Sequence, residues 1–189
     1  MGLIHHLQQL TTISNGAIDW LKQHTEEFTF KKNEIILPEG KTCNHLYYVV
    51  NGLVGSYYVI EDHEVCNWIA MEEDMATCYY SFISREPSYE TIVAFEPTTL
   101  HAVSYHTIQA LYNQFPETER AGRLILENYY SRLEERLISI QFKSAKERYD
   151  MLFNKRPEIF NRAPLGRVAT YLGMKQETLS RIRSERSGS

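Results

Sequence analysis

The stretch HLYYVVNGLVGSYYVI, residues 45–60, decides how the first half of the chain is expected to fold. Apolar residues recur at every second position on both sides of Asn51-Gly52. This alternation is typical of strands, and Asn-Gly is a strong signal for a two-residue turn between paired strands. We therefore predict an antiparallel hairpin that turns at Asn51-Gly52. The side chains on its apolar face are Leu46, Tyr48, Val50, Leu53, Gly55, Tyr57 and Val59.

The flanking sequence contains more short strands of the same kind. FTFKKNEIILPEG, EVCNWIAM and ETIVAFEPTTLHAVSY are rich in β-branched and aromatic residues, and the last is interrupted at Glu96-Pro97. An antiparallel β-roll or barrel is the economical way to bury so many short apolar faces. We expect this domain to occupy residues 1–115, with a short helix, GAIDWLKQHTEEF, ahead of the first strand.

Residues 116–142 have the pattern of one long helix that begins with Pro116. Apolar residues recur there at spacings of 4, 3, 4 and 3, which is a heptad seam. We predict that two copies pair along this seam as a parallel homodimer. The alternative is that the seam packs on the roll, although Leu124 and Ile125 already supply a face for that contact. The predicted dimer interface is Leu126, Tyr130, Leu133, Leu137 and Ile140.

The last segment, residues 143–189, is predicted to be all helical. SAKERYDMLFNKRP forms one helix that stops before Pro157, and LGRVATYLGMKQETLSRIRSE, residues 165–185, forms two short helices hinged at Gly173. A small residue, Ala169, lies four positions before the hinge, as a helix-turn-helix requires. The alternative is an ordinary helical hairpin. The residues expected between the two helices are Val168, Leu172, Met174, Leu179 and Ile182, together with Ala169.

The charge is divided unequally along the chain. Residues 1–140 hold 9 Lys and Arg against 19 Asp and Glu, whereas residues 141–189 hold 11 against 5. A net charge of −4 therefore hides an acidic part and a basic part. Such asymmetry is typical of a polyanion-binding module, and the alternative is a solvated basic surface.

The second helix of this pattern offers polar side chains suited to duplex DNA. Gln, Glu and Arg can read base edges in the major groove, and basic residues hold phosphates. A two-fold dimer would put two such helices about 34 Å apart, one turn of a palindromic duplex. The expected base-facing residues are Gln176, Glu177, Ser180 and Arg181, and the expected phosphate contacts are Arg167, Lys175 and Arg183.

The order of these parts resembles the CRP/FNR family of bacterial transcription regulators. KKNEIILPEG is similar to the family's Lys-Gly-Glu strand entry, with Asn33 where Gly is usual, and HLYYVVNGLVG is similar to its Leu-Tyr-x-Val-x-x-Gly hairpin. KQETLSRIR resembles the Arg-Glu-Thr-Val-x-Arg recognition pattern, with Gln176 replacing the usual Arg. The resemblance implies an α+β chain, with a cyclic-nucleotide-binding-like β-roll (double-stranded β-helix), a dimerisation helix and a helix-turn-helix. It also implies double-stranded DNA and RNA polymerase as partners.

The chain departs from this family at the sensor pocket and after the helix-turn-helix. The family's phosphate-binding Gly-Glu positions hold Thr77 and Cys78, and its Arg position falls at Ser88 or Tyr89. We therefore expect neither cyclic AMP nor any identifiable cofactor. An aromatic-lined cavity for another, unknown small-molecule effector is the alternative to a merely filled roll, and its candidates are Tyr79, Tyr80, Phe82, Arg85 and Tyr89. EIFNRAP is too short for the strands of the usual wing, which is reduced or absent.

Other classes of protein fit the sequence less well. A cupin-type metalloenzyme needs an H-x-H pair, which the chain lacks, so we expect neither an enzyme nor a metal site, although haem stays open because seven histidines are scattered along it. The three cysteines form no CxxC pair. No secretion signal and no apolar run of about 18 residues is present, which favours a cytoplasmic protein without membrane contact. The remaining alternative is a small-molecule sensor whose helical tail contacts protein instead of DNA.

Overall fold

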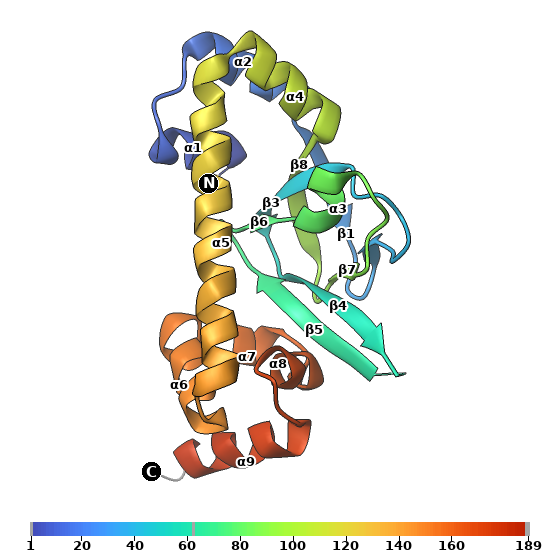
Figure 1. The fold of residues 1–189 in the computed structure, drawn as a ribbon, viewed down its shortest axis with the longest axis vertical. Helices are drawn as coiled ribbons and strands as arrows, with labels where there is room; N and C mark the ends of the chain where they lie inside the picture. The colour runs from blue at the N-terminus through green and yellow to red at the C-terminus, as the bar shows by residue number, and fades with distance from the viewer. Residues whose placement is uncertain (1, 62, 188–189) are drawn as a thin grey trace.

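Two antiparallel sheets form the N-terminal half of the computed structural model, which describes residues 2–61 and 63–187 (Figure 1). One sheet contains, in spatial order, β1 (Glu26–Phe30), β8 (Thr98–Ser104), β3 (His45–Asn51) and β6 (Met75–Ala76). The other contains β2 (Ile35–Leu37), β7 (Thr91–Ala94), β4 (Val54–Ile60) and β5 (His63–Ala70). All strand pairs are antiparallel. The predicted antiparallel β architecture is confirmed.

The predicted hairpin across Asn51-Gly52 is wrong, because the chain changes sheets at this turn. β3 pairs with β8 and β6, whereas β4 pairs with β5 and β7. Gly52 has a φ of +105°, and a Cβ there would lie 2.4 Å from the Thr98 hydroxyl. The turn between β7 and β8 therefore packs directly on Gly52, and β4 leaves β3 to enter the second sheet.

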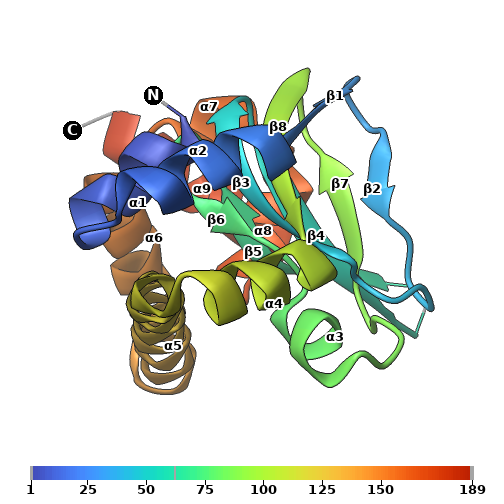
Figure 2. The ribbon, with the colours of Figure 1, turned by 90° about the horizontal axis from the view of Figure 1, so that it is seen from above.

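Both faces of β3 are covered, so its alternation separates two cores and not core from solvent. Tyr48 packs with helices α1 (Leu3–Leu10), α2 (Asn15–His24) and α4 (Tyr105–Gln114), which lie together on one side of the sheets (Figure 2). Tyr47 and Val49 belong to a separate core. An alternating pattern alone cannot reveal that helices from elsewhere in the chain cover the second face.

One long helix joins the two halves of the molecule. After a 3₁₀ turn (Pro116–Thr118), α5 (Glu119–Phe142) runs as a rod from α1 to the C-terminal helices (Figure 1). The helix predicted for residues 116–142 is confirmed. Its buried residues Ala121 and Ile125 belong to the core that α1, α2 and α4 share with the roll. Across the described residues, every helix is too short or too polar to cross a membrane.

The C-terminal segment is helical, as predicted. Helix α6 (Ala145–Lys155) begins at a capping box in which Ser144 and Glu147 satisfy each other's backbone N–H groups. Helix α7 (Ile159–Arg162) fills the segment that was considered for a wing. Helices α8 (Leu165–Tyr171) and α9 (Gln176–Ser187) follow, and Gly173 takes a φ of +65° in the turn between them.

The C-terminal helices pack on the second sheet and share a core with it. Helix α8 lies along β5 (Figure 1), and the Cys66 N–H donates to the Thr170 hydroxyl over 3.0 Å. Leu53 and Phe95 from the roll are in one apolar cluster with Ile159 and Val168 from the helices. This shared core spans the predicted boundary at residue 143.

Arginines of α5 and α7, and Arg156 at the C-cap of α6, pair with carboxylates of the roll. Asp74 is buried and accepts from both terminal nitrogens of Arg156 and from Arg132, whose Nη1 lies 3.1 Å from its Oδ1. Arg162 donates to Glu72 and to Glu96, with closest distances of 2.7 Å and 2.6 Å. Bidentate guanidinium–carboxylate pairs fix orientation as well as distance. These pairs hold the C-terminal helices in one position on the roll.

The Glu72–Arg162 pair should make this attachment sensitive to acid. The hydrogen bond from Arg162 lowers the pKa of Glu72 from 4.5 to about 2. Because the folded-state pKa is depressed, the stabilisation is complete above pH 4.5 and is lost as the pH falls towards 2. We expect Glu72→Gln to lower the free energy of unfolding by about 1 kcal/mol at neutral pH, because the pair is partly exposed.

Urea denaturation at a series of pH values measures this effect. Glu39→Gln is the control, since the Glu39 side chain is exposed and makes no ion pair with any described residue. Equal losses of stability in the two variants would contradict the role of the Glu72 carboxylate.

Candidate nucleic-acid interface and sensor pocket

Helix α9 presents a polar face to solvent and an apolar face to α6 and α8. Leu179 and Ile182 are 0% and 7% exposed, and they pack in the core of the C-terminal helices. The opposite face carries side chains that can donate and accept hydrogen bonds. The predicted DNA-contacting residues that are exposed on or beside this helix are Lys175, Gln176, Glu177, Ser180 and Arg181.

The turn before α9 is held by backbone hydrogen bonds and by buried apolar residues. The Met174 N–H donates to the Ala169 carbonyl and the Gly173 N–H donates to the Thr170 carbonyl, both over 3.0 Å. Val168, Ala169 and Leu172 are buried beneath the turn, as predicted, and Met174 is half-buried. The two helices are therefore fixed relative to each other, which gives α9 a rigid base.

Two predicted phosphate contacts lie apart from the open face. The Arg167 guanidinium stacks 3.8 Å from the Tyr57 ring centroid and pairs with Glu64 over 2.6 Å. Its side chain is 16% exposed, so in this arrangement it serves the contact between α8 and the roll. Arg183 is half-buried and donates to the Phe160 carbonyl over 3.4 Å.

The aromatic residues predicted for the sensor pocket fall into two groups. Tyr79 and Phe82, on α3 (Tyr79–Ser84), line an apolar cavity, and the Tyr79 ring stacks on Tyr129 of α5 at 3.9 Å. Tyr80 and Tyr89 face outward, with 48% and 62% of their surface exposed, and their hydroxyls lie 3.2 Å apart. The structure therefore brings only Tyr79 and Phe82 to a common cavity.

Arg85 is used within the protein. It caps α3 with a φ of 63°, and its guanidinium donates to the Cys43 carbonyl and to Asn44, over 2.8 Å and 2.5 Å. The same group lies 4.2 Å from the Tyr105 ring centroid. These contacts join α3 to the loop before β3, and with a bond to the Phe82 carbonyl they use three of the five guanidinium donors.

A buried carboxylate that the sequence analysis missed lies in the roll. Glu90 is 4% exposed and accepts from Ser56 over 2.5 Å, from Asn67 over 2.9 Å and from the Trp68 indole over 3.3 Å. The sequence feature that could have indicated this buried carboxylate is its position immediately before the apolar strand TIVA. A negative charge in this position opposes the entry of a phosphate.

A polar cleft of about 670 Å³ opens where β5 and β6 face α5. Arg132, Arg136 and Arg156 reach it, and Asp74 already binds the first and the third of these. Arg136 donates to the Cys66 and Tyr171 carbonyls, while its buried Nε has no hydrogen-bond partner among the described residues. The basic groups of this cleft are thus mainly committed to holding the C-terminal helices.

The described residues contain no cluster of three His, Cys, Asp or Glu side chains able to hold a metal ion. Cys43, Cys66 and Cys78 are buried free thiols, and burial raises the pKa of Cys66 to about 12. The Cys66 thiol is therefore protonated at neutral pH.

Comparison with known proteins extends over most of the chain. A family model described as the cyclic nucleotide-binding domain matches residues 27–115, and no curated protein matches the sequence. FixK2 from Bradyrhizobium japonicum is 20% identical, with 85% of this chain and 83% of FixK2 covered and a TM-score of 0.72. A CooA mutant from Carboxydothermus hydrogenoformans is 18% identical, with 100% of this chain and 85% of CooA covered and a TM-score of 0.71.

The regulator CLP of Xanthomonas campestris, described as responsive to c-di-GMP, is 16% identical, with 93% of this chain and 92% of CLP covered and a TM-score of 0.65. Identities this low show the fold alone. The chain thus matches the cyclic nucleotide-binding domain model over residues 27–115, and it has the fold of FixK2, CooA and CLP.

Proposed function

We propose that this protein is a homodimeric transcription regulator of the CRP/FNR type that binds a palindromic DNA duplex through α9. The observation that carries the proposal is the open polar face of α9 on a basic C-terminal segment. Lys175, Gln176 and Arg181 are exposed there, while Leu179 and Ile182 anchor the helix from behind. Exposed polar side chains on a rigid helix are what reading of a major groove requires.

Base reading is assigned to Gln176, Glu177, Ser180 and Arg181, and Lys175 holds a phosphate. Arg183 contributes a second phosphate contact at the edge of the same helix. Arg167 joins them only when its pair with Glu64 opens, since a guanidinium stacked on Tyr57 has no free path to a duplex. DNA and the roll would therefore compete for Arg167.

The exposed seam of α5 supports a homodimer. An apolar row of this length on a soluble helix is typical of a contact surface. Its members and their exposed fractions are Leu126 42%, Tyr130 64%, Leu133 44%, Leu137 54% and Ile140 40%. Pairing along this row would relate the two α9 helices by a two-fold axis, and a palindromic duplex has the same symmetry.

The effector of the sensor domain is proposed to be a small molecule other than cyclic AMP. Glu90 places a carboxylate inside the roll, and Arg85 is held by Cys43 and Asn44. A cyclic phosphate would therefore meet repulsion in place of a cationic partner. The protein is further proposed to be non-enzymatic and to contact RNA polymerase when bound to DNA.

Substitutions in α9 and at Lys175, immediately before it, should separate base reading from phosphate binding. We expect Arg181→Ala to lose about 1–3 kcal/mol of discrimination at one base pair. We expect Lys175→Ala to weaken specific and scrambled duplexes alike and to reduce the log–log salt slope by about 1. Fluorescence anisotropy with duplexes selected from a random pool, at several salt concentrations, measures both effects.

Lys22→Ala is the matched control, because it removes an exposed positive charge from α2, far along the chain from α9. Equal losses on specific and scrambled duplexes for Arg181→Ala would contradict base reading. Salt-indifferent retention of the wild-type protein on random duplex or heparin would favour the alternative function, a sensor whose helical tail contacts protein.

Charge on the α5 seam should abolish the dimer. Leu137→Lys places a charge into each half of the proposed interface, where each leucine contributes about 1.5–3 kcal/mol. We expect sedimentation equilibrium to show a wild-type dimer and a monomeric variant at micromolar concentration, with a matching loss of operator affinity. Ser131→Lys, which lies off the seam on the same helix, should stay dimeric. A monomeric wild-type protein would refute the proposed assembly.

Cyclic AMP should leave the regulator unchanged. Because Glu90 opposes a phosphate in the roll, we expect operator affinity with and without millimolar cyclic AMP to agree within about two-fold. The same anisotropy titration provides the measurement. A saturable change in affinity with cyclic AMP would overturn the assignment of Glu90.

A further inference from the structure

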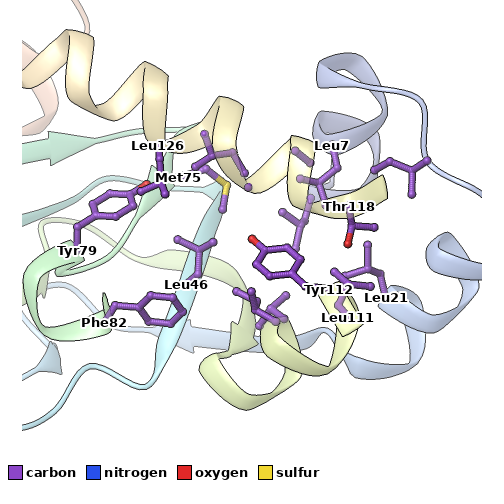
Figure 3. A pocket seen from close by; sticks show the side chains of 17 residues that line it. Leu7, Leu21, Leu46, Met75, Tyr79, Phe82, Leu111, Tyr112, Thr118 and Leu126 are labelled. Carbon is purple, nitrogen blue, oxygen red and sulfur yellow. The ribbon is translucent and has the colours of Figure 1, made fainter. Parts of the chain in front are cut away.

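A second, apolar cavity lies beside the roll, between α1, α2, α4 and α5 (Figure 3). Its volume is about 100 Å³. A cavity of roughly 150 Å³ lined by Leu, Ile and Phe stays free of water and admits benzene. The cavity of this protein is about two-thirds of that volume, so a single small ring or a short chain of carbon atoms is the most that it holds.

The walls of this cavity are almost entirely hydrocarbon. They include Leu7 of α1, Leu21 of α2, Leu111 of α4 and Ile125 of α5, with Phe82 closing one side. The described lining residues contain no Lys, Arg, His, Asp or Glu. Transfer of an uncompensated charge into such surroundings is strongly unfavourable, so an occupant has to be neutral.

Two phenol hydroxyls give the cavity its polarity. Thr118 also lines it, but its hydroxyl already donates to the Phe115 carbonyl over 2.7 Å. The hydroxyls of Tyr79 and Tyr112 have no hydrogen-bond partner among the described residues. Tyr112 stands between the helices because α5 has a glycine opposite it: a Cβ on Gly122 would lie 2.0 Å from the Tyr112 hydroxyl.

We propose that this cavity binds a small, uncharged, mainly hydrocarbon molecule that carries one hydrogen-bonding group, and that Tyr112 receives this group. The volume sets the size of the ligand, the hydrocarbon walls exclude charge, and the unpartnered phenol selects a hydroxyl or carbonyl. The site is separate from the interior of the roll where Glu90 lies, since none of the Glu90 partners Ser56, Asn67 and Trp68 lines it.

The cavity is also placed to act on the dimer helix. Ala121 and Ile125 of α5 form part of its wall, and Leu126, the one lining residue with an exposed side chain, belongs to the proposed dimer seam. Filling the cavity therefore presses on the helix that would pair the two subunits. This regulatory consequence rests on the proposed function, whereas ligand binding by itself does not.

Isothermal titration of the full-length protein with benzyl alcohol tests the site. We expect saturable binding, and at least ten-fold weaker binding to Ala121→Leu, whose larger side chain fills the cavity. Ala110→Leu makes the same change on the exposed face of α4 and should bind like the wild type. Tyr112→Phe should bind benzyl alcohol about five-fold more weakly and leave toluene binding unchanged, because it removes one hydrogen bond. Benzoate, which carries a charge, should not bind.

Three results would overturn the proposed binding site. Absence of benzyl alcohol binding, equal binding by wild type and Ala121→Leu, or comparable binding of benzoate overturns the proposal. If Ala121→Leu does not fold, the split between benzyl alcohol and toluene in Tyr112→Phe decides, and equal changes for both overturn it. Operator affinity measured in parallel keeps the two hypotheses apart: intact DNA binding without ligand binding refutes this site alone, and ligand binding without DNA binding refutes the proposed function alone.

Discussion

The carboxylate of Asp74 is the contact on which the arrangement of the molecule depends. It is buried in the roll and joins two guanidinium groups, Arg132 from the long helix and Arg156 from the C-terminal helices. A buried charge left without partners costs far more than the pair contributes when complete. The roll, the rod and the C-terminal helices therefore keep one mutual orientation as long as this triad holds. This orientation determines which side of α8 is covered by the roll and which face of α9 is open.

Much of the fold was predictable because local patterns were strong. The strand alternation, the unbroken helix of residues 116–142 and the hinge at Gly173 each reflect interactions within a few residues. The pairing of strands did not follow, because the contact that diverts β4 comes from Thr98, which is 46 positions beyond Gly52. A turn signal reports the local bend of the backbone, whereas the sheet that a strand joins is decided by distant neighbours.

The candidate sites were predictable in unequal measure. The exposed face of α9 could be found because Leu179 and Ile182 mark the buried side of the helix, and its other residues are polar. The apolar cavity could not, because its walls come from helices scattered along the chain and Tyr112 is a single residue among them. Glu90, in the separate interior of the roll, is likewise a single residue without a surrounding motif. For Arg167, the residue type alone did not reveal the contacts that it makes in the fold. Its residue type indicates a phosphate contact. In the structure, however, its guanidinium pairs with Glu64 and stacks on Tyr57, which lie about a hundred positions earlier in the chain.

The loop between β5 and β6 has a mechanical consequence for the molecule. Glu72 and Asp74 are two positions apart in that loop, yet Glu72 binds Arg162 of α7 and Asp74 binds Arg156, which caps the end of α6. Because both ion pairs lie on one short segment, the two helices that they hold cannot move independently of each other. A tilt of this loop would turn both helices together, carrying α8 and α9 with them as a rigid body. A displacement of the loop between β5 and β6 would thus also move the far end of the protein, where α9 lies.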